Sequence, residues 1–307
     1  PSTPDSQYII LSSDAVYSKP DMQANTPSDL LNKKNKADYL IITTHELRDS
    51  ARSLASYREG KGLRTMVVEF EDILDEFNYG IFNPEAIRAF LYYAYRNWDI
   101  SPRYVVLAGE GTYDYKDNYG YGENLIPAVM VNTPFGLSPS DNYFADMDGK
   151  FVPKMAVGRL PVASTGEFQA YITKVASYES CGDGAWQKNI LMLADRPDDA
   201  GNFPSDSNEV ASLLPTGYSV KKIYLSELSL AKARQILMEQ INQGSMLLNY
   251  IGHSSIDRLS NSGLLTSDDI SPLVNGCRMP LVTSMTCFMN DFSYPGYDTL
   301  GEALTMK

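Results

Sequence analysis

The sequence has 307 residues, 43% hydrophobic and 21% charged, which is typical of a soluble globular protein. Its 38 acidic and 26 basic residues give a net charge of −12, which argues against a nucleic-acid-binding function because that function needs a basic surface. The sequence contains no apolar run of about 18 residues, so we expect no membrane span.

The three cysteines are Cys181, Cys277 and Cys287. Three cysteines are too few for a disulfide framework, and an odd number leaves at least one free thiol unless two chains pair. Cysteine content therefore leaves the redox compartment of the protein open.

Residues 1–36 are polar and proline-rich, and we expect an irregular lead-in around one short strand at 8–11. From residue 37 onward, short apolar runs alternate with amphipathic segments, which indicates buried strands that alternate with helices. The first alternation predicts strands at 39–43, 65–68 and 104–108, a helix from 47 to about 60, and a helix that begins at Asn83-Pro84.

Residues 110–150 are rich in Gly, Asn, Asp and Tyr and predict a long loop, which in a compact domain is usually functional. Ser164 and Glu167 have the spacing of a capping box that begins a helix. The second alternation predicts strands at 189–194, 220–225, 246–251 and 281–286 and helices at 206–214 and 230–243. Repeated strand–helix units predict an α/β fold with mostly parallel sheets and helices on both faces.

Reactive side chains follow two of these strands. His253 comes directly after the strand that ends near Ile251, and Cys287 comes directly after the strand 281–286. Ligands of parallel sheets bind at the carboxyl ends of the strands, so the imidazole and the thiol share one edge if the strands are neighbours. A base then converts the thiol to the nucleophilic thiolate, and the backbone N–H groups of Ser254 and Cys287 are placed to hold an oxyanion. The alternative is that both side chains are inert, since cysteine is often simply buried.

Short strings spread over residues 37–307 resemble, in this order along the chain, the gingipain-type cysteine peptidases of the caspase-like clan. They are ADYLIIT (37–43), DILDEF (72–77), NPEAIR (83–88), YVVLAGEG (104–111), SDNYFA (140–145) followed by Asp148-Gly149, AVGRLPV (156–162), NYIGH (249–253), Thr286-Cys287 and GEAL (301–304). Where the family usually has Gly after the catalytic histidine, this sequence has Ser254.

The resemblance implies a caspase-like three-layer α/β/α sandwich with two subdomains side by side. The lead-in 1–36 precedes an N-terminal subdomain at 37–184 and a catalytic subdomain at 185–307. The implied activity is that of a cysteine endopeptidase acting on polypeptides, with Cys287 as the nucleophile, His253 as the proton carrier and no cofactor needed for the chemistry. Asp141 is our candidate for an acidic third member.

Two other activities remain open from the sequence. One is a sortase-like transpeptidase of a secretion pathway, which would pass the acyl group to an amine instead of water. The other is a catalytically inactive caspase-like binding module.

The resemblance also bears on partners, location and metal. Family members continue past the catalytic strand, so we expect the second subdomain to be incomplete at Lys307, with a further C-terminal segment or a second chain beside strand 281–286. The family implies secretion or a bacterial cell surface, although no signal is present in this sequence. It also implies structural calcium, for which the acidic loops 195–199 and 146–149 are candidates; the alternative is ordinary solvated turns.

Overall fold

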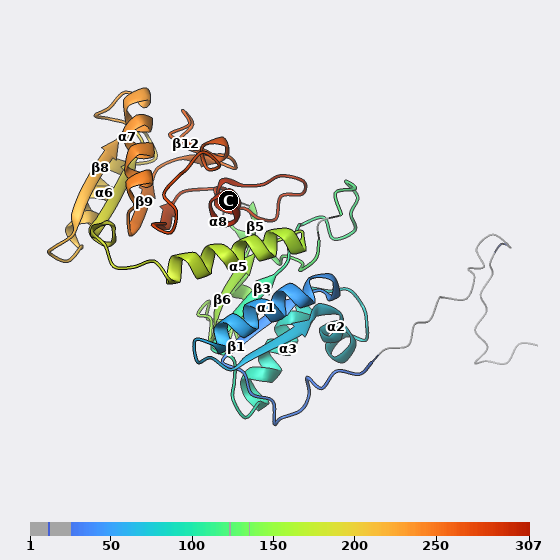
Figure 1. The fold of residues 1–307 in the computed structure, drawn as a ribbon. Helices are drawn as coiled ribbons and strands as arrows, with labels where there is room; N and C mark the ends of the chain where they lie inside the picture. The colour runs from blue at the N-terminus through green and yellow to red at the C-terminus, as the bar shows by residue number, and fades with distance from the viewer. Residues whose placement is uncertain (1–11, 13–25, 123, 135) are drawn as a thin grey trace, which may run out of the picture.

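The computed structural model describes residues 12, 26–122, 124–134 and 136–307, so the expected strand at 8–11 lies outside the described residues. Two four-stranded parallel sheets dominate these residues, one built before residue 161 and one after residue 188 (Figure 1). Helices cover both faces of each sheet, which confirms the expected α/β sandwich. Within the described part of the chain, no helix is both long and apolar enough to cross a bilayer.

The first sheet has the strand order β2-β1-β3-β6. Its strands are β1 (Tyr39–Thr43), β2 (Thr65–Glu69), β3 (Tyr104–Ala108) and β6 (Ala156–Leu160). The helices around it are α1 (Arg48–Glu59), α2 (Phe70–Asn78), α3 (Glu85–Asn97) and α5 (Thr165–Glu179). The sequence had predicted all of these except β6 and α2.

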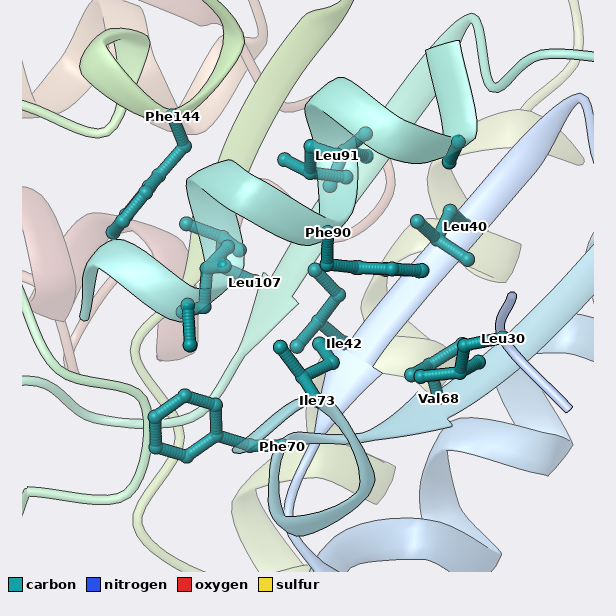
Figure 2. Packing of buried hydrophobic residues seen from close by; sticks show 14 of the residues in the cluster. Leu30, Leu40, Ile42, Val68, Phe70, Ile73, Phe90, Leu91, Leu107 and Phe144 are labelled. Atoms are coloured by element: carbon teal, nitrogen blue, oxygen red, sulfur yellow. The ribbon is translucent and has the colours of Figure 1, made fainter. Parts of the chain in front are cut away.

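Successive side chains of β1 point to opposite faces and thereby define the layers. Leu40 and Ile42 pack with α2 and α3, including Phe90 and Ile73 (Figure 2). Ile41 packs on the other face against α1 and α5. Because both faces of the strand are covered, the three central residues of β1 are all apolar, and this short apolar run predicts the strand.

The second sheet has the strand order β13-β9-β7-β8 and follows the same plan. Its strands are β7 (Asn189–Ala194), β8 (Ser219–Tyr224), β9 (Leu247–Ile251) and β13 (Leu281–Met285). Helix α7 (Leu230–Gln243) covers one face and α6 (Phe203–Ser212) covers the other. The expected strands and helices are confirmed to within about three residues at each end.

The predicted long loop contains structure of its own. Strands β4 (Met130–Thr133) and β5 (Gly136–Pro139) form a hairpin, and a one-turn helix α4 (Asn142–Ala145) follows them. After β9 the chain forms a small antiparallel sheet from β10 (Ser254–Ser255), β11 (Arg258–Leu259) and β12 (Leu265–Thr266). Helix α8 (Leu300–Met306) comes last and begins with a capping box between Thr299 and Glu302.

A disulfide joins Cys181, just after α5, to Cys277, just before β13. Cys287 is left as a free and exposed thiol. The odd number of cysteines is therefore accounted for within one chain, although the spacing of 96 positions gave no sign of the pairing.

Candidate active site

His253 and Cys287 leave the second sheet at the same edge. Strands β9 and β13 are parallel neighbours with Ile251 opposite Met285, so each reactive residue stands two positions beyond the last pair. Two bonds continue the contact past the strands: the Gly252 N–H donates to the Met285 carbonyl at 3.3 Å, and the Ser254 hydroxyl donates to the Cys287 carbonyl. The structure thus brings the imidazole-bearing and thiol-bearing loops into direct contact.

The imidazole of His253 is held from one side by a carboxylate. Its Nε2 lies 2.8 Å from Oδ2 of Asp198, in the loop that follows β7. The ring also packs edge to face with Phe203 at the start of α6, with a centroid distance of 5.3 Å. The pKa of Asp198 is held below its ordinary value, first by the N–H of Ala200 and then by His253. Asp198 therefore stays ionised at neutral pH. Its carboxylate holds the ring so that Nε2 faces Asp198 and Nδ1 faces away from it.

The backbone beneath His253 is fixed by a buried tyrosine. The hydroxyl of Tyr250 donates to the His253 carbonyl at 2.5 Å, and the N–H of Ser260 donates to the same oxygen at 2.8 Å. Asp195 accepts from the Ser260 hydroxyl at 3.1 Å and so holds the second of these donors in place. Burial raises the pKa of Tyr250, so its hydroxyl remains a donor.

Gly252 is the one position between β9 and His253 that only glycine fits. Its φ is +154°, and a Cβ there would lie 2.5 Å from the Cβ of Asp195 and 2.6 Å from the hydroxyl of Tyr250. Real Cβ atoms do not tolerate such distances. The close approach lets the chain pass directly over Tyr250, which brings the His253 carbonyl within reach of that hydroxyl.

Cys287 lies at a sharp turn at the end of β13. Phe288, the next residue, has a φ of +49°, and the N–H of Met289 turns back to the Cys287 carbonyl at 2.5 Å. Left-handed non-glycine residues are uncommon and often mark functional sites. The turn leaves the thiol exposed at the surface instead of packed in the core.

Asp141, the acidic residue expected from the sequence, has a different partner. Its two carboxylate oxygens accept from Nε and Nη2 of Arg159, each at 2.8 Å. Arg159 is almost fully buried and also donates to the carbonyls of Gly109 and Ile126. Asp141 thus neutralises a buried guanidinium, while the carboxylate that contacts His253 belongs to Asp198.

The sequence places Asp198 in a loop that we expect to bind calcium, and it does not predict the contact with His253. Asp198 lies in the acidic loop 195–199, directly after a predicted strand. The rule that placed His253 and Cys287 at strand ends applies equally to β7, which lies next to β9. What the sequence lacked was the strand order, since it does not say that β7 and β9 are neighbours.

The carboxylates of the two acidic loops proposed for calcium have partners within the protein. Asp198 contacts His253, and Asp146 accepts from the N–H groups of Lys150 and Phe151. Asp148 pairs with Lys154 at 3.1 Å. Among the described residues, no group of three or more His, Cys, Asp or Glu side chains is arranged to hold a metal ion. Structural calcium stays a prediction.

Comparisons with solved structures agree with this architecture. The crystal structure of the Arg-specific cysteine proteinase gingipain R (RgpB) matches with a TM-score of 0.71 at 20% identity, covering 92% of this chain and 61% of that one. The complex of Porphyromonas gingivalis RgpB pro- and mature domains matches with a TM-score of 0.69 at 21% identity, covering 88% of this chain and 60% of that one. A third structure, described as a protease, gives a TM-score of 0.66 at 19% identity, covering 91% of this chain and 57% of that one.

At these identities the likeness concerns the fold, and the chain spans about 60% of the length of the gingipain chains it matches. A search of curated proteins returned no match to the sequence. The sequence model of peptidase family C25 matches residues 32–307. This range is nearly the whole chain and includes His253 and Cys287. The chain therefore belongs to peptidase family C25, the gingipain family.

Proposed function

We propose that this chain carries the catalytic centre of a cysteine endopeptidase, with Cys287 as the nucleophile and His253 as the acid–base residue. The observation that carries the proposal is the contact between the loops after β9 and β13, which places an exposed thiol and an imidazole at one sheet edge. Membership of a peptidase family supports the same reading.

The proposed reaction proceeds in two steps. His253 takes the proton of the Cys287 thiol, and the sulfur attacks the carbonyl carbon of the scissile bond. His253 then passes that proton to the amine that leaves, so that an acyl-enzyme remains. A water molecule, deprotonated by His253, attacks the acyl carbon, and the thiolate leaves and recovers its proton from His253.

We propose Asp198 as the residue that orients His253, in place of Asp141. Because Asp198 bonds to Nε2, Nδ1 is the nitrogen that remains for the proposed proton exchange with the thiol. An ionised carboxylate at this position stabilises the imidazolium that forms when the thiol loses its proton. Asp198 is thus a positioning residue that acts through His253.

The backbone N–H groups of Cys287 and Ser254 remain our proposed donors to the oxyanion. The contact between the Ser254 hydroxyl and the Cys287 carbonyl supports this, because it fixes the two residues beside each other. A serine side chain in place of the family's glycine leaves the N–H donor intact and adds a hydroxyl that ties the two loops together.

The decisive experiment is cleavage of a peptide library by the wild type, Cys287→Ala and His253→Ala. We expect cleavage by the wild type alone, and faster modification of Cys287 by iodoacetamide than of a model thiol, with the excess rate lost in His253→Ala. Products joined to an added amine would instead identify a transpeptidase. Wild-type labelling at the model-thiol rate, with no cleavage, would indicate a binding module.

We further propose that the protein works outside the cytoplasm, in a secreted or cell-surface location. The disulfide between Cys181 and Cys277 supports this, because disulfides persist in oxidising compartments and are rare in the cytosol. Non-reducing mass spectrometry of the protein isolated from its source tests the point: two free thiols in addition to Cys287 would contradict it.

An extended segment is proposed to pair with the outer edge of β13. Among the described strands, none pairs with that edge, and Leu281 and Met285 are 65% and 63% exposed. A cavity of about 980 Å³ lies between this strand and α5, with Val282 and Lys174 in its wall. Unpaired edge strands are normally covered or blocked, so a segment of the whole protein or a second copy is expected here.

Hydrogen exchange distinguishes the two sources of this segment. If a second copy supplies it, protection of the amides at 281–285 rises with protein concentration. If another segment of the same polypeptide supplies it, protection is high at every concentration in the protein isolated from its source. Fast exchange in both cases would contradict the pairing.

A further inference from the structure

Four tyrosines lie in the region where the loop after β3 touches the segment that follows Cys287. The rings of Tyr113 and Tyr294 pack edge to face with centroids 5.8 Å apart. The N–H of Tyr113 also donates to the Ser293 carbonyl at 3.1 Å. Burial raises the pKa of Tyr113, and the nearby Tyr294 and Tyr119 act in the same direction. Tyr119 is held close to this pair, because its N–H donates at 2.8 Å to Oδ2 of Asp114, the residue after Tyr113.

Tyr121 extends the group. Its ring lies directly against Gly296, where an added Cβ would come within 2.5 Å of a ring atom. We call Tyr113, Tyr119, Tyr121 and Tyr294 the tyrosine surface. Glycine at 296 lets the backbone after Cys287 approach the ring closely, so the two segments are fitted to each other.

The tyrosine surface is open to solvent. Tyr113, Tyr119, Tyr121 and Tyr294 are 37%, 65%, 56% and 44% exposed. Aromatic rings that are grouped and exposed mark interaction sites, because single scattered apolar residues are normal but clusters are not. Tyrosine is also enriched in binding surfaces, since its ring contacts apolar groups while its hydroxyl bonds to backbone.

The surface lies within reach of a substrate bound at Cys287. Tyr294 follows Cys287 by seven residues, which span at most about 25 Å when fully extended. Turns shorten this distance, since the Asp291 N–H returns to the Phe288 carbonyl at 3.1 Å and the Tyr294 N–H returns to that of Asp291 at 3.4 Å. An extended peptide advances about 3.3 Å per residue, so about eight residues of substrate are long enough to span from the scissile bond to the surface.

We propose that the tyrosine surface binds an extended stretch of the polypeptide substrate, so that unfolded polypeptides are cleaved in preference to short peptides. The inference rests on the proposed peptidase function. Its chemistry is contact between the tyrosine rings and the aliphatic, aromatic or proline side chains of the substrate, with the hydroxyls bonding to its backbone. The surface adds affinity and leaves the bond-breaking groups unchanged.

The test compares two substrates that contain the same cleavage sequence. One is a short peptide of four to six residues, and the other is an unfolded polypeptide of about 30 residues. In Tyr119→Ala/Tyr121→Ala we expect kcat/KM for the long substrate to fall about tenfold, mainly through KM, because exposed aromatic anchors contribute on this scale. The value for the short peptide stays within about twofold, which also shows that the variant is folded.

Two control variants sharpen the comparison. Tyr92→Ala removes another exposed tyrosine, 45% exposed on α3 and outside the tyrosine surface, and is expected to leave cleavage of both substrates unchanged. Tyr119→Phe/Tyr121→Phe keeps the rings and retains most of the preference for the long substrate. Equal losses on the two substrates, or no loss on the long one, would overturn the inference.

A binding measurement with an inactive variant distinguishes a failure of this inference from a failure of the proposed peptidase function. Cys287→Ala cannot form the acyl-enzyme, so fluorescence anisotropy with the labelled 30-residue polypeptide reports binding alone. We expect binding that weakens about tenfold when the two alanines at 119 and 121 are added. If the wild type cleaves neither substrate but this difference persists, the surface stands and the peptidase assignment is wrong. If binding is unchanged by the alanines, the surface is wrong.

Discussion

Nε2 of His253 and Oδ2 of Asp198 lie 2.8 Å apart, although 55 positions separate the two residues in the sequence. The contact exists because β7 and β9 are neighbouring parallel strands whose following loops meet at one edge. Both side chains are partly exposed, so the pair is open to solvent and to salt. The carboxylate therefore orients the ring more than it stabilises the fold.

We expect Asp198→Asn to lower kcat/KM by about tenfold, since the amide keeps the shape of the side chain but loses the charge that supports the imidazolium. The rate of Cys287 alkylation, measured from pH 5 to 9, falls in parallel. Asp199→Asn removes a neighbouring exposed charge and serves as the control. Equal effects of the two variants would show that only the general negative potential of the loop matters.

Tyr250 and Tyr224 form a matched pair for testing the support beneath His253. Both are buried in the second sheet, but Tyr250 bonds to the His253 carbonyl while Tyr224 bonds to Ser207 and Asn208. Each Tyr→Phe change removes a buried hydroxyl and is expected to cost about 1 kcal/mol in the free energy of unfolding.

The two variants are expected to differ in the reactivity of Cys287. Tyr250→Phe frees one of the two bonds to the His253 carbonyl, so alkylation of Cys287 slows and its pH dependence shifts. Tyr224→Phe leaves both unchanged. The idea that Tyr250 positions His253 fails if the two variants react at the same rate while showing equal loss of stability in urea.

Gly252→Ala is expected to destabilise the protein by about 2–4 kcal/mol, because it adds a steric overlap to an unfavourable φ. Gly217 is the control: its φ is +100°, but an added Cβ meets nothing within 4 Å. Gly217→Ala reports the backbone strain alone, about 1 kcal/mol. Urea unfolding of the two variants gives the difference, and equal losses would mean that Asp195 and Tyr250 move aside at no cost.

A carboxyl group on α2 gives the protein a measurable pH dependence. Burial, together with the neighbouring Glu69 and Asp75, raises the pKa of Asp72 from 3.8 to about 6. Because the folded value lies above the unfolded one, the protonated form stabilises the fold. That contribution is complete below pH 3.8 and is lost as the pH rises through about 6.

Asp72→Asn mimics the protonated form. We expect its free energy of unfolding, relative to the wild type, to grow between pH 4 and pH 7 by about 1 kcal/mol, allowing for solvent screening. Glu46→Gln, which removes an exposed carboxylate that does not raise the pKa of Asp72, shows no such growth. A difference that stays flat across this range would mean that Asp72 titrates normally.

The sequence was sufficient for the parts of the fold that are buried on both faces. The short apolar runs of β1, β3, β7 and β9 indicate strands covered on both faces, and Ile87 and Phe90 mark the inner face of α3. Strand β6 was missed because it reads AVGRL, with a glycine and a charged residue in a short segment. Arg159 of this strand binds the carboxylate of Asp141, and this ion pair is the reason that Asp141 does not contact His253.

The sequence predicts those residues of the candidate site that directly follow a predicted strand. Cys287 and His253 follow strands that the sequence identifies, and their meeting depends only on β9 and β13 being neighbours. Asp198 depends on a third strand and on its order in the sheet, and the pairing of Cys181 with Cys277 depends on where α5 ends relative to β13. Strand order and loop paths arise from tertiary packing, and a single sequence does not record them.

The bond between Cys181 and Cys277 has a consequence for a protein that cuts polypeptides. It joins residues 96 positions apart, and the segment between them includes β7, β8, β9 and His253. A self-inflicted nick anywhere in that stretch would leave two pieces that stay covalently attached and can keep their shape. On a gel, such damage would be invisible until a reductant is added, so an apparently intact preparation can already consist of clipped molecules.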